Sequence, residues 1–123
     1  MKKIIIVDDD STNNHICETM IHKLLKDVEV ISFVNPVKAF EYLKSNNPGP
    51  DGLVIIDVNM PEMSGWQLIN LMNESNVVVP IIMLTSSISH QDKETASEIK
   101  MVREFFVKPI NPGMITGLNV YMN

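Results

Sequence analysis

Carboxylates follow two of the most apolar runs in this chain. Asp8 and Asp9 come directly after the run at 4–7, and Asp57 comes directly after the run at 53–56. Short runs rich in isoleucine and valine are typical of strands buried on both faces. Because the C-terminal ends of parallel strands share one crevice, we expect the three carboxylates to lie close together. Carboxylates so placed repel one another, and a bound hard divalent cation relieves that repulsion.

Two other apolar runs end in a hydroxyl group and in a cation. Thr85 follows the run at 81–84, and Lys108 follows the run at 105–107. A hydroxyl can hydrogen-bond a phosphoryl oxygen, and a lysine offers a positive charge to the same group. Phosphoryl transfer asks a protein mainly for positioning and charge stabilisation around the acceptor. The combination predicts a phosphoryl-transfer site with the Asp57 carboxylate as nucleophile.

Alternating strand and helix patterns supply a frame for this site. Strand patterns occur at 3–7, 28–33, 52–56, 80–85 and 104–107. Helical patterns fall between them, at 12–26, from Pro36 onward, at 65–73 and at 90–100, with a short, frayed helix around Gly113 and Gly117. Strict alternation implies a parallel sheet with helices on both faces. We therefore predict a flavodoxin-like, doubly wound α/β fold with a five-stranded parallel sheet in the order 2-1-3-4-5, in which the first and third strands are neighbours.

The first predicted helix is amphipathic. Ile16, Met20 and Leu24 recur four residues apart with Cys17, Ile21 and Leu25 beside them, so the apolar side of the helix is expected to include both rows. Asn14 falls on the opposite, polar side. Ser11 or Thr12 is the expected N-cap, because a side-chain hydroxyl there can accept a backbone N–H of the first turn.

Composition limits the class of protein. The chain has 123 residues, 45% of them hydrophobic, which suits one domain over 1–123 without an output domain. Its net charge of −5 argues against general binding of nucleic acid or anionic membranes. No apolar run approaches the roughly 20 residues of a membrane helix. Cys17 is the single cysteine, so no internal disulfide can form, and a cytoplasmic location fits.

Four segments together resemble the receiver domain of two-component response regulators, in particular a stand-alone, chemotaxis-type member. One such segment alone would be a weak signal, but the four occur in the family's order and spacing and span nearly the whole chain. They are Ile-Ile-Val-Asp-Asp-Asp at 5–10, Ile-Asp-Val-Asn-Met-Pro-Glu-Met-Ser-Gly at 56–65, Ile-Met-Leu-Thr-Ser at 82–86 and Phe-Val-Lys-Pro-Ile at 106–110.

The resemblance implies a phosphoacceptor and a metal site. Asp57 would take a phosphoryl group from a phosphohistidine on a sensor histidine kinase or a histidine phosphotransfer protein. Mg²⁺ would be bound by Asp8, Asp9, Asp57 and the backbone carbonyl of Asn59. The protein would not be a conventional enzyme, although it would catalyse its own phosphoryl acceptance and a slow autodephosphorylation. Positions such as Asn59 and Ser87 would tune the lifetime of the phosphoryl group.

The resemblance also implies a switch. Thr85 would move towards the phosphoryl group, Lys108 would pair with Asp57 or its phosphate, and Pro109 would follow through a cis peptide bond. Phe105 matches the aromatic switch position of the family and would swing inward with Thr85. The face formed by the fourth helix, fifth strand and fifth helix would then change its affinity for a downstream protein whose identity the sequence does not give. A monomer is expected, with dimerisation on activation left open.

Two other functions compete with this interpretation. A pseudo-receiver would keep the fold as a binding module and accept no phosphate, but such proteins usually lack an acid, the acceptor or the lysine. Asp8, Asp10 and Thr12 also fit the Asp-x-Asp-x-Thr motif of haloacid-dehalogenase-type phosphatases. That family needs further acids after its lysine, and residues 109–123 contain no Asp or Glu. It would also leave Asp57 without a role.

Overall fold

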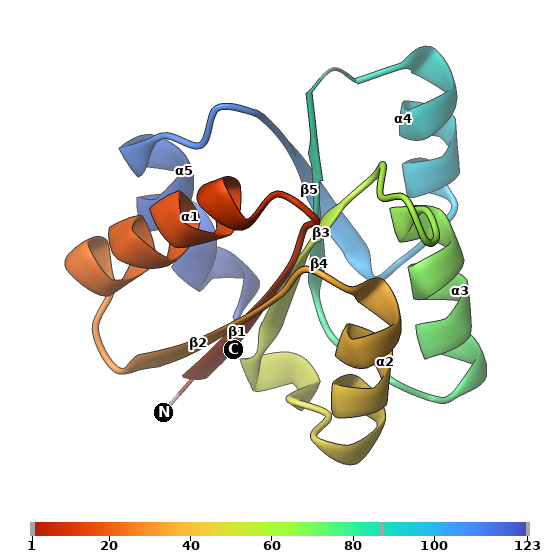
Figure 1. Cartoon of the computed structure of the whole chain (residues 1–123), viewed down its shortest axis with the longest axis horizontal. Helices are drawn as coiled ribbons and strands as arrows, with labels where there is room; N and C mark the ends of the chain where they lie inside the picture. Colours follow the sequence, from red (N-terminus) through yellow and green to blue (C-terminus); the bar gives the residue numbers. More distant parts are fainter. Residues whose placement is uncertain (1, 87, 123) are drawn as a thin grey trace.

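A computed structural model describes residues 2–86 and 88–122 of the chain, so Ser87, predicted to tune phosphoryl lifetime, lies outside the described residues. Five parallel strands form one sheet in the order β2-β1-β3-β4-β5, as predicted (Figure 1). The strands are β1 (Lys2–Val7), β2 (Val28–Phe33), β3 (Leu53–Asp57), β4 (Ile81–Thr85) and β5 (Val102–Val107). The helices are α1 (Ser11–Leu24), α2 (Pro36–Ser45), α3 (Gly65–Glu74), α4 (His90–Ser97) and α5 (Pro112–Thr116), with short 3₁₀ turns at Gly49–Asp51 and Gly117–Tyr121.

Helices cover both faces of the sheet. In Figure 1, α1 and α5 lie on one side of it, while α2, α3 and α4 lie on the other. Successive strand residues point to opposite faces. Accordingly Ile4 and Ile6 pack in a core cluster with residues of α1 and α5, whereas Ile5 and Val7 pack in a second cluster with residues of α2 and α3. This two-sided burial explains why the central strands are uninterrupted apolar runs.

The pairing of β1 with β3 determines where the acids lie. Val7 is the register partner of Ile56, so the chain leaves both strands at the same level of the sheet. Asp8 follows Val7, and Asp57 is the last residue of β3. The neighbouring strand ends predicted from the sequence are thus present.

The setting of α1 differs from the prediction in three respects. Asp10, rather than Ser11 or Thr12, is the N-cap, and its side chain accepts the backbone N–H groups of Thr12 and Asn13. Asn14 was expected to face solvent, but its side chain is buried. Ile16 is instead 44% exposed. Cys17 and Ile21 of the predicted apolar side are buried as expected, so the buried face of α1 is shifted only slightly about the helix axis, from Ile16 towards Asn14, whose amide donates to the backbone carbonyl of Asp8.

The fourth helix packs little against the sheet, and the fifth helix is short. All of α4 lies within the described residues, and none of its side chains is buried. Ser89 caps its N-terminus by accepting the backbone N–H of Asp92. α5 has only five residues before the chain tightens into a 3₁₀ turn at Gly117. No helix within residues 2–86 and 88–122 is long and apolar enough to cross a membrane.

Gly65, the first residue of α3, is in close contact with the end of β3. A Cβ atom built there would lie 2.6 Å from the backbone oxygen of Asp57 and 2.9 Å from the Cε atom of Met83. The backbone N–H of Gly65 also donates to the carbonyl of Val58 at 2.8 Å. A glycine is therefore required here, because any side chain would push α3 away from the strand end that carries Asp57.

We expect Gly65→Ala to lower the free energy of unfolding by about 1–3 kcal/mol, since the added methyl group collides with backbone that cannot move freely. Gly117→Ala is the matched control, because a Cβ atom at Gly117 would meet nothing within 4 Å. That variant should leave stability unchanged or raise it by up to about 1 kcal/mol. Urea unfolding of both variants measures the difference. Equal stabilities for the two would contradict the close approach.

Candidate functional site

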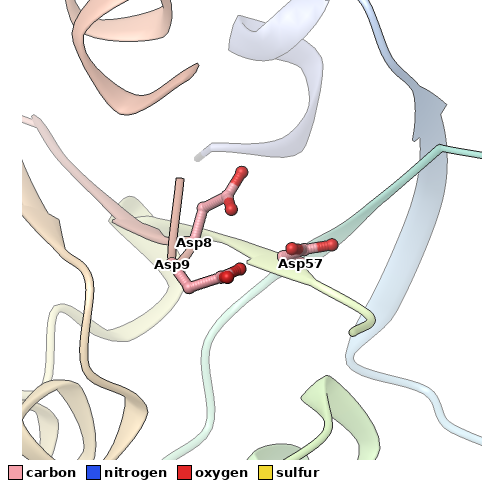
Figure 2. A group of neighbouring side chains, drawn as sticks. All are labelled: Asp8, Asp9 and Asp57. Carbon is pink, nitrogen blue, oxygen red and sulfur yellow. The ribbon is translucent and has the colours of Figure 1, made fainter. Parts of the chain in front are cut away.

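The ends of the central strands bring the predicted acids together. Figure 2 shows Asp8 and Asp9, which follow β1, beside Asp57 at the end of β3. Each residue offers a carboxylate oxygen, and these oxygens all lie within 4.8 Å of one another. Asp8 and Asp57 are buried, whereas Asp9 is exposed. The group is thus open to solvent on the side of Asp9 and closed beneath the other two acids.

The carboxylate of Asp8 is held by donors on both oxygens. Its Oδ1 accepts the backbone N–H of Asp10 at 3.0 Å, and its Oδ2 accepts the side-chain amide of Asn13 at 2.9 Å. The side-chain amide of Asn14 donates to the backbone carbonyl of Asp8, also at 2.9 Å. These contacts explain how a charged side chain can be completely buried, since a buried carboxylate must have its hydrogen-bonding capacity met.

Lys108 is the cation of the site and contacts two of the acids. Its Nζ atom lies 3.0 Å from Asp8 Oδ2 and 3.8 Å from Asp57 Oδ2. Burial by itself would lower the pKa of Lys108, but its hydrogen bond to Asp8 and the charges of Asp8 and Asp57 outweigh burial, so the pKa is raised. Lys108 therefore stays protonated and offsets part of the negative charge around it.

Asp57 is the acid whose protonation is most affected by its surroundings. Burial, followed by the neighbouring charge of Asp8, raises its pKa to about 7, although the positive charge of Lys108 opposes this. The backbone N–H of Asn59 donates to Asp57 Oδ1 at 3.4 Å and also favours the ionised form. Repulsion between the carboxylates is therefore incompletely offset by Lys108 alone.

Three further predicted residues, Thr85, Pro109 and Asn59, lie at the end of a strand or within two residues of one. Thr85 is the last residue of β4 and is buried, and its backbone carbonyl accepts the N–H of Lys108 at 2.8 Å. The peptide bond between Lys108 and Pro109 is cis. Asn59 is exposed at the rim of the site and contacts Asp57 through its backbone N–H.

Phe105 lies apart from the acids. It is a partly buried residue of β5 that packs against the core cluster beneath α2 and α3. Its ring makes an edge-to-face contact with Trp66, with ring centroids 6.1 Å apart and an interplanar angle of 68°. The structure therefore separates the predicted site residues into a group around Asp57 and an aromatic pair on one face of the sheet.

The donor atoms fit a hard divalent cation. Carboxylate oxygens are the ligands that Mg²⁺ and Ca²⁺ prefer, and Mg²⁺ commonly binds one or two carboxylates and keeps several waters. The exposed side of Asp9 leaves room for such waters. Burial and the neighbouring charge of Asp8 raise the pKa of Asp57, and a bound cation would oppose that rise by favouring the ionised carboxylate. Asp8, Asp9 and Asp57 are therefore suited to holding Mg²⁺.

The sequence reasoning missed the two asparagines that orient Asp8. Asn13 was not considered, and Asn14 was placed on the wrong side of α1. A signal was available, because α1 begins only three residues after Asp8, so polar side chains in its first turn are within reach of the strand end. Amides at that distance from a predicted metal ligand are typical of the outer contacts that orient such ligands.

Comparisons with known proteins agree on one family. The sequence model of the response regulator receiver domain matches residues 4–118. Chemotaxis protein CheY1 of Helicobacter pylori (strain J99 / ATCC 700824) is 31% identical over 115 residues, which cover 92% of this chain and 90% of that protein. The probable transcriptional regulator ycf27 of Porphyridium aerugineum is 33% identical over 112 residues, 90% of this chain. The chain spans only 43% of the length of that regulator.

Solved structures give the same result for the fold. The chemotaxis protein CheY4 of Vibrio cholerae superposes with a TM-score of 0.80 at 26% identity, and the match covers 99% of each chain. The receiver domain of a putative Luxo repressor protein from Vibrio parahaemolyticus gives a TM-score of 0.84 at 18% identity over 97% of this chain. Fold, order of strands and sequence therefore agree, and the chain belongs to the response regulator receiver domain family of two-component signalling.

Proposed function

We propose that this receiver domain accepts a phosphoryl group on Asp57 with the help of Mg²⁺ and thereby switches its contacts with other proteins. The observation that carries the proposal is the convergence of carboxylate oxygens from Asp8, Asp9 and Asp57 within 4.8 Å, with the Lys108 ammonium beside them. A nucleophile, a cation site and a fixed positive charge are the elements that phosphoryl transfer to a carboxylate requires.

In the proposed reaction an Asp57 carboxylate oxygen attacks the phosphorus of a phosphohistidine. The new O–P bond forms as the P–N bond breaks, and the departing imidazole keeps that electron pair and takes a proton from water. Asp8, Asp9, Asp57 and the backbone carbonyl of Asn59 would hold Mg²⁺, which would supply positive charge that offsets the phosphoryl oxygens. Hydrolysis of the aspartyl phosphate by water would return the carboxylate, which makes the domain self-resetting without being a conventional enzyme.

Thr85 and Lys108 would recognise the phosphoryl group. Both lie at strand ends next to the acceptor, linked through the backbone bond from Lys108 to Thr85. Before transfer, the Lys108 Nζ atom is closer to Asp8 than to Asp57. The added charge on Asp57 would attract Lys108, and the Thr85 hydroxyl would donate to a phosphoryl oxygen. Movement of Thr85 would then allow Phe105 to swing inward.

Partners follow from this chemistry. The phosphoryl donor would be a sensor histidine kinase or a histidine phosphotransfer protein, and the output would be a change in affinity of the α4–β5–α5 face for a protein partner. The receiver domain would act by protein contact or by passing the phosphoryl group on, in a monomeric resting state. A cytoplasmic location suits such partners and the buried free thiol of Cys17.

The phosphatase alternative is less consistent with the contacts of Asp10. A phosphatase with the Asp-x-Asp-x-Thr motif would use Asp10 as a residue of that motif, yet the Asp10 carboxylate accepts two backbone N–H groups as the N-cap of α1. A pseudo-receiver that accepts no phosphate remains the principal alternative. The following experiment separates these functions.

We expect wild-type protein to gain one phosphoryl group on incubation with acetyl phosphate and Mg²⁺, and Asp57→Asn to gain none, because the amide is a poor nucleophile. Intact-mass spectrometry measures the adduct. Asp10→Asn is the matched control, since asparagine also serves as an N-cap and this variant should still be phosphorylated. An adduct on Asp57→Asn would contradict the assignment of the acceptor, and no adduct on wild type would favour the pseudo-receiver.

Lys108→Ala should bind Mg²⁺ at least as tightly as wild type, because it removes a cation that competes for Asp8 and Asp57. The same variant should lose the conformational response to phosphorylation. Isothermal titration with Mg²⁺ measures the first effect, and the change in Trp66 fluorescence on phosphorylation measures the second. The exposed Lys23→Ala should match wild type in both assays. Weaker Mg²⁺ binding by Lys108→Ala would oppose the role given to Lys108.

The raised pKa of Asp57 predicts a pH-dependent stability of the ion-free protein. Asp57 releases its proton near pH 7 in the folded protein, and an unfolded aspartate does so near about pH 4. Between these values the unfolded chain binds fewer protons, so this residue's contribution to stability falls as pH rises and is fully lost above about pH 7.

Asp57→Asn carries no charge at this position and should not lose stability in this way as the pH rises. Its free energy of unfolding should therefore exceed that of wild type by a margin that grows from about pH 5 to about pH 8, as measured by urea unfolding without divalent ions. Adding Mg²⁺ at the higher pH should narrow the gap, because only wild type keeps all three carboxylates. A gap that stays constant with pH would contradict the electrostatic account of Asp57.

A further inference from the structure

Trp66 joins three elements on the face of the sheet covered by α3 and α4. It is the second residue of α3, and its indole N–H donates to Asp92 Oδ1 of α4 at 3.2 Å. The same ring packs edge-to-face on Phe105 of β5. Both contacts are between residues far apart in the sequence, and no motif of the resemblance includes Trp66 or Asp92.

In the part of the chain that the structure describes, few side-chain contacts other than this hydrogen bond attach α4 to the rest of the protein. None of its eight residues is buried, so it gains little from packing. Its other side-chain hydrogen bonds are internal to the helix or its N-cap, such as that between Thr95 and the carbonyl of Gln91. Within residues 2–86 and 88–122, the bond from Trp66 to Asp92 is the one side-chain hydrogen bond that joins α4 to another element.

The space beneath α4 is also incompletely filled. A groove of about 470 Å³ lies between α3 and the C-terminal end of α4, lined on its apolar side by Trp66, Ile69, Ile99 and Met101. These four residues belong to or pack against the same core cluster as Phe105. A helix above an open groove can shift without disrupting a close-packed core, and the bond from Trp66 to Asp92 is a contact that opposes such a shift.

We propose that Trp66 is a positioning residue that holds α4 and the Phe105 ring in the observed arrangement, by its hydrogen bond to Asp92 and its edge contact with Phe105. We call this pair of contacts the Trp66 latch. Release of either contact loosens α4. The latch is local to this chain's side chains and does not require a ligand.

The latch also connects the candidate phosphoacceptor to α4, and this part rests on the proposed function. An inward turn of Phe105 would break its edge contact with Trp66. Trp66 would then hold Asp92 less firmly. Gly65 precedes Trp66 and lies against the backbone of Asp57. Trp66 therefore follows directly after a residue that contacts the strand carrying Asp57, while its own indole contacts α4. Its fluorescence is expected to respond to movement at either place. It is the single tryptophan of the chain, so its fluorescence has one source.

The test is amide hydrogen exchange of α4 in the unphosphorylated protein. Trp66→Phe keeps an aromatic ring and loses the donor, and Asp92→Ala loses the acceptor. Each should speed exchange of the α4 amides roughly tenfold, as expected for a lost hydrogen bond to a charged group. Asp92→Asn keeps an acceptor and should restore slow exchange. Glu94→Ala is the matched control, because within residues 2–86 and 88–122 the side chain of Glu94 pairs with His90 of the same helix and not with another element.

The double variant Trp66→Phe/Asp92→Ala decides whether the two residues act together. If they form one latch, its α4 amides exchange no faster than those of either single variant. Effects that multiply, or single variants that exchange at the wild-type rate, would overturn the proposal. Urea unfolding of each variant distinguishes loosening of α4 from loss of the fold.

A second arm examines the link to Asp57 with acetyl phosphate and Mg²⁺, using intact mass to follow the adduct. On phosphorylated wild type, Trp66 emission should shift and α4 exchange should quicken, whereas Trp66→Phe should show fast exchange with or without the adduct. Absence of the adduct would refute the proposed function and leave the latch to be judged by the first arm. An adduct without any change in Trp66 emission or α4 exchange would refute the link.

Discussion

Repulsion among carboxylates at the ends of β1 and β3 is the constraint on which the rest of this structure depends. Asp8 and Asp57 are both buried, and burial raises the cost of each charge. The fold meets that cost at Asp8 with the Lys108 ammonium, the Asn13 amide and a backbone N–H. It meets it only in part at Asp57, whose pKa is raised to about 7. Because the cost of its negative charge is only partly offset, Asp57 would respond to a bound cation.

This uneven distribution suits a switch. Asp8 is oriented by fixed donors, whereas Asp57 has a long contact to Lys108 and one to the Asn59 backbone. A group held loosely by charge can change partners when its own charge changes, and the surrounding strand ends then respond. The stability lost at Asp57 is a local consequence of burying a second carboxylate beside Asp8 in an otherwise well-packed α/β core.

The two faces of the sheet differ in how firmly their helices are attached. α1 buries Cys17 and Ile21 against the sheet and is tied to the site through Asn13 and Asn14. α4 buries no side chain and is attached through Asp92. A conformational change that begins at the strand ends therefore meets least resistance at α4, which is part of the α4–β5–α5 face expected to carry the output.

The strands, their order and the meeting of Asp8, Asp9 and Asp57 can all be predicted from the amino-acid sequence. Each of these follows from local information, because uninterrupted apolar runs identify buried strands and strict alternation with helices leaves few topologies. Periodicity also located α1 within two residues at each end. It could not give the rotation of α1 about its axis, so Asn14 was assigned to solvent.

The side chains that satisfy the buried acids and those that contact α4 become apparent only in the folded protein. Asp10 became a helix cap, Asn13 a partner of Asp8, and Trp66 a partner of Asp92 across 26 positions of sequence. Lys108 lies nearer to Asp8 than to the predicted acceptor. These contacts depend on the relative placement of elements within a fraction of a helical turn. Local patterns of apolar and polar residues do not encode that placement, because several rotations bury similar apolar area and differ only in their long-range polar contacts.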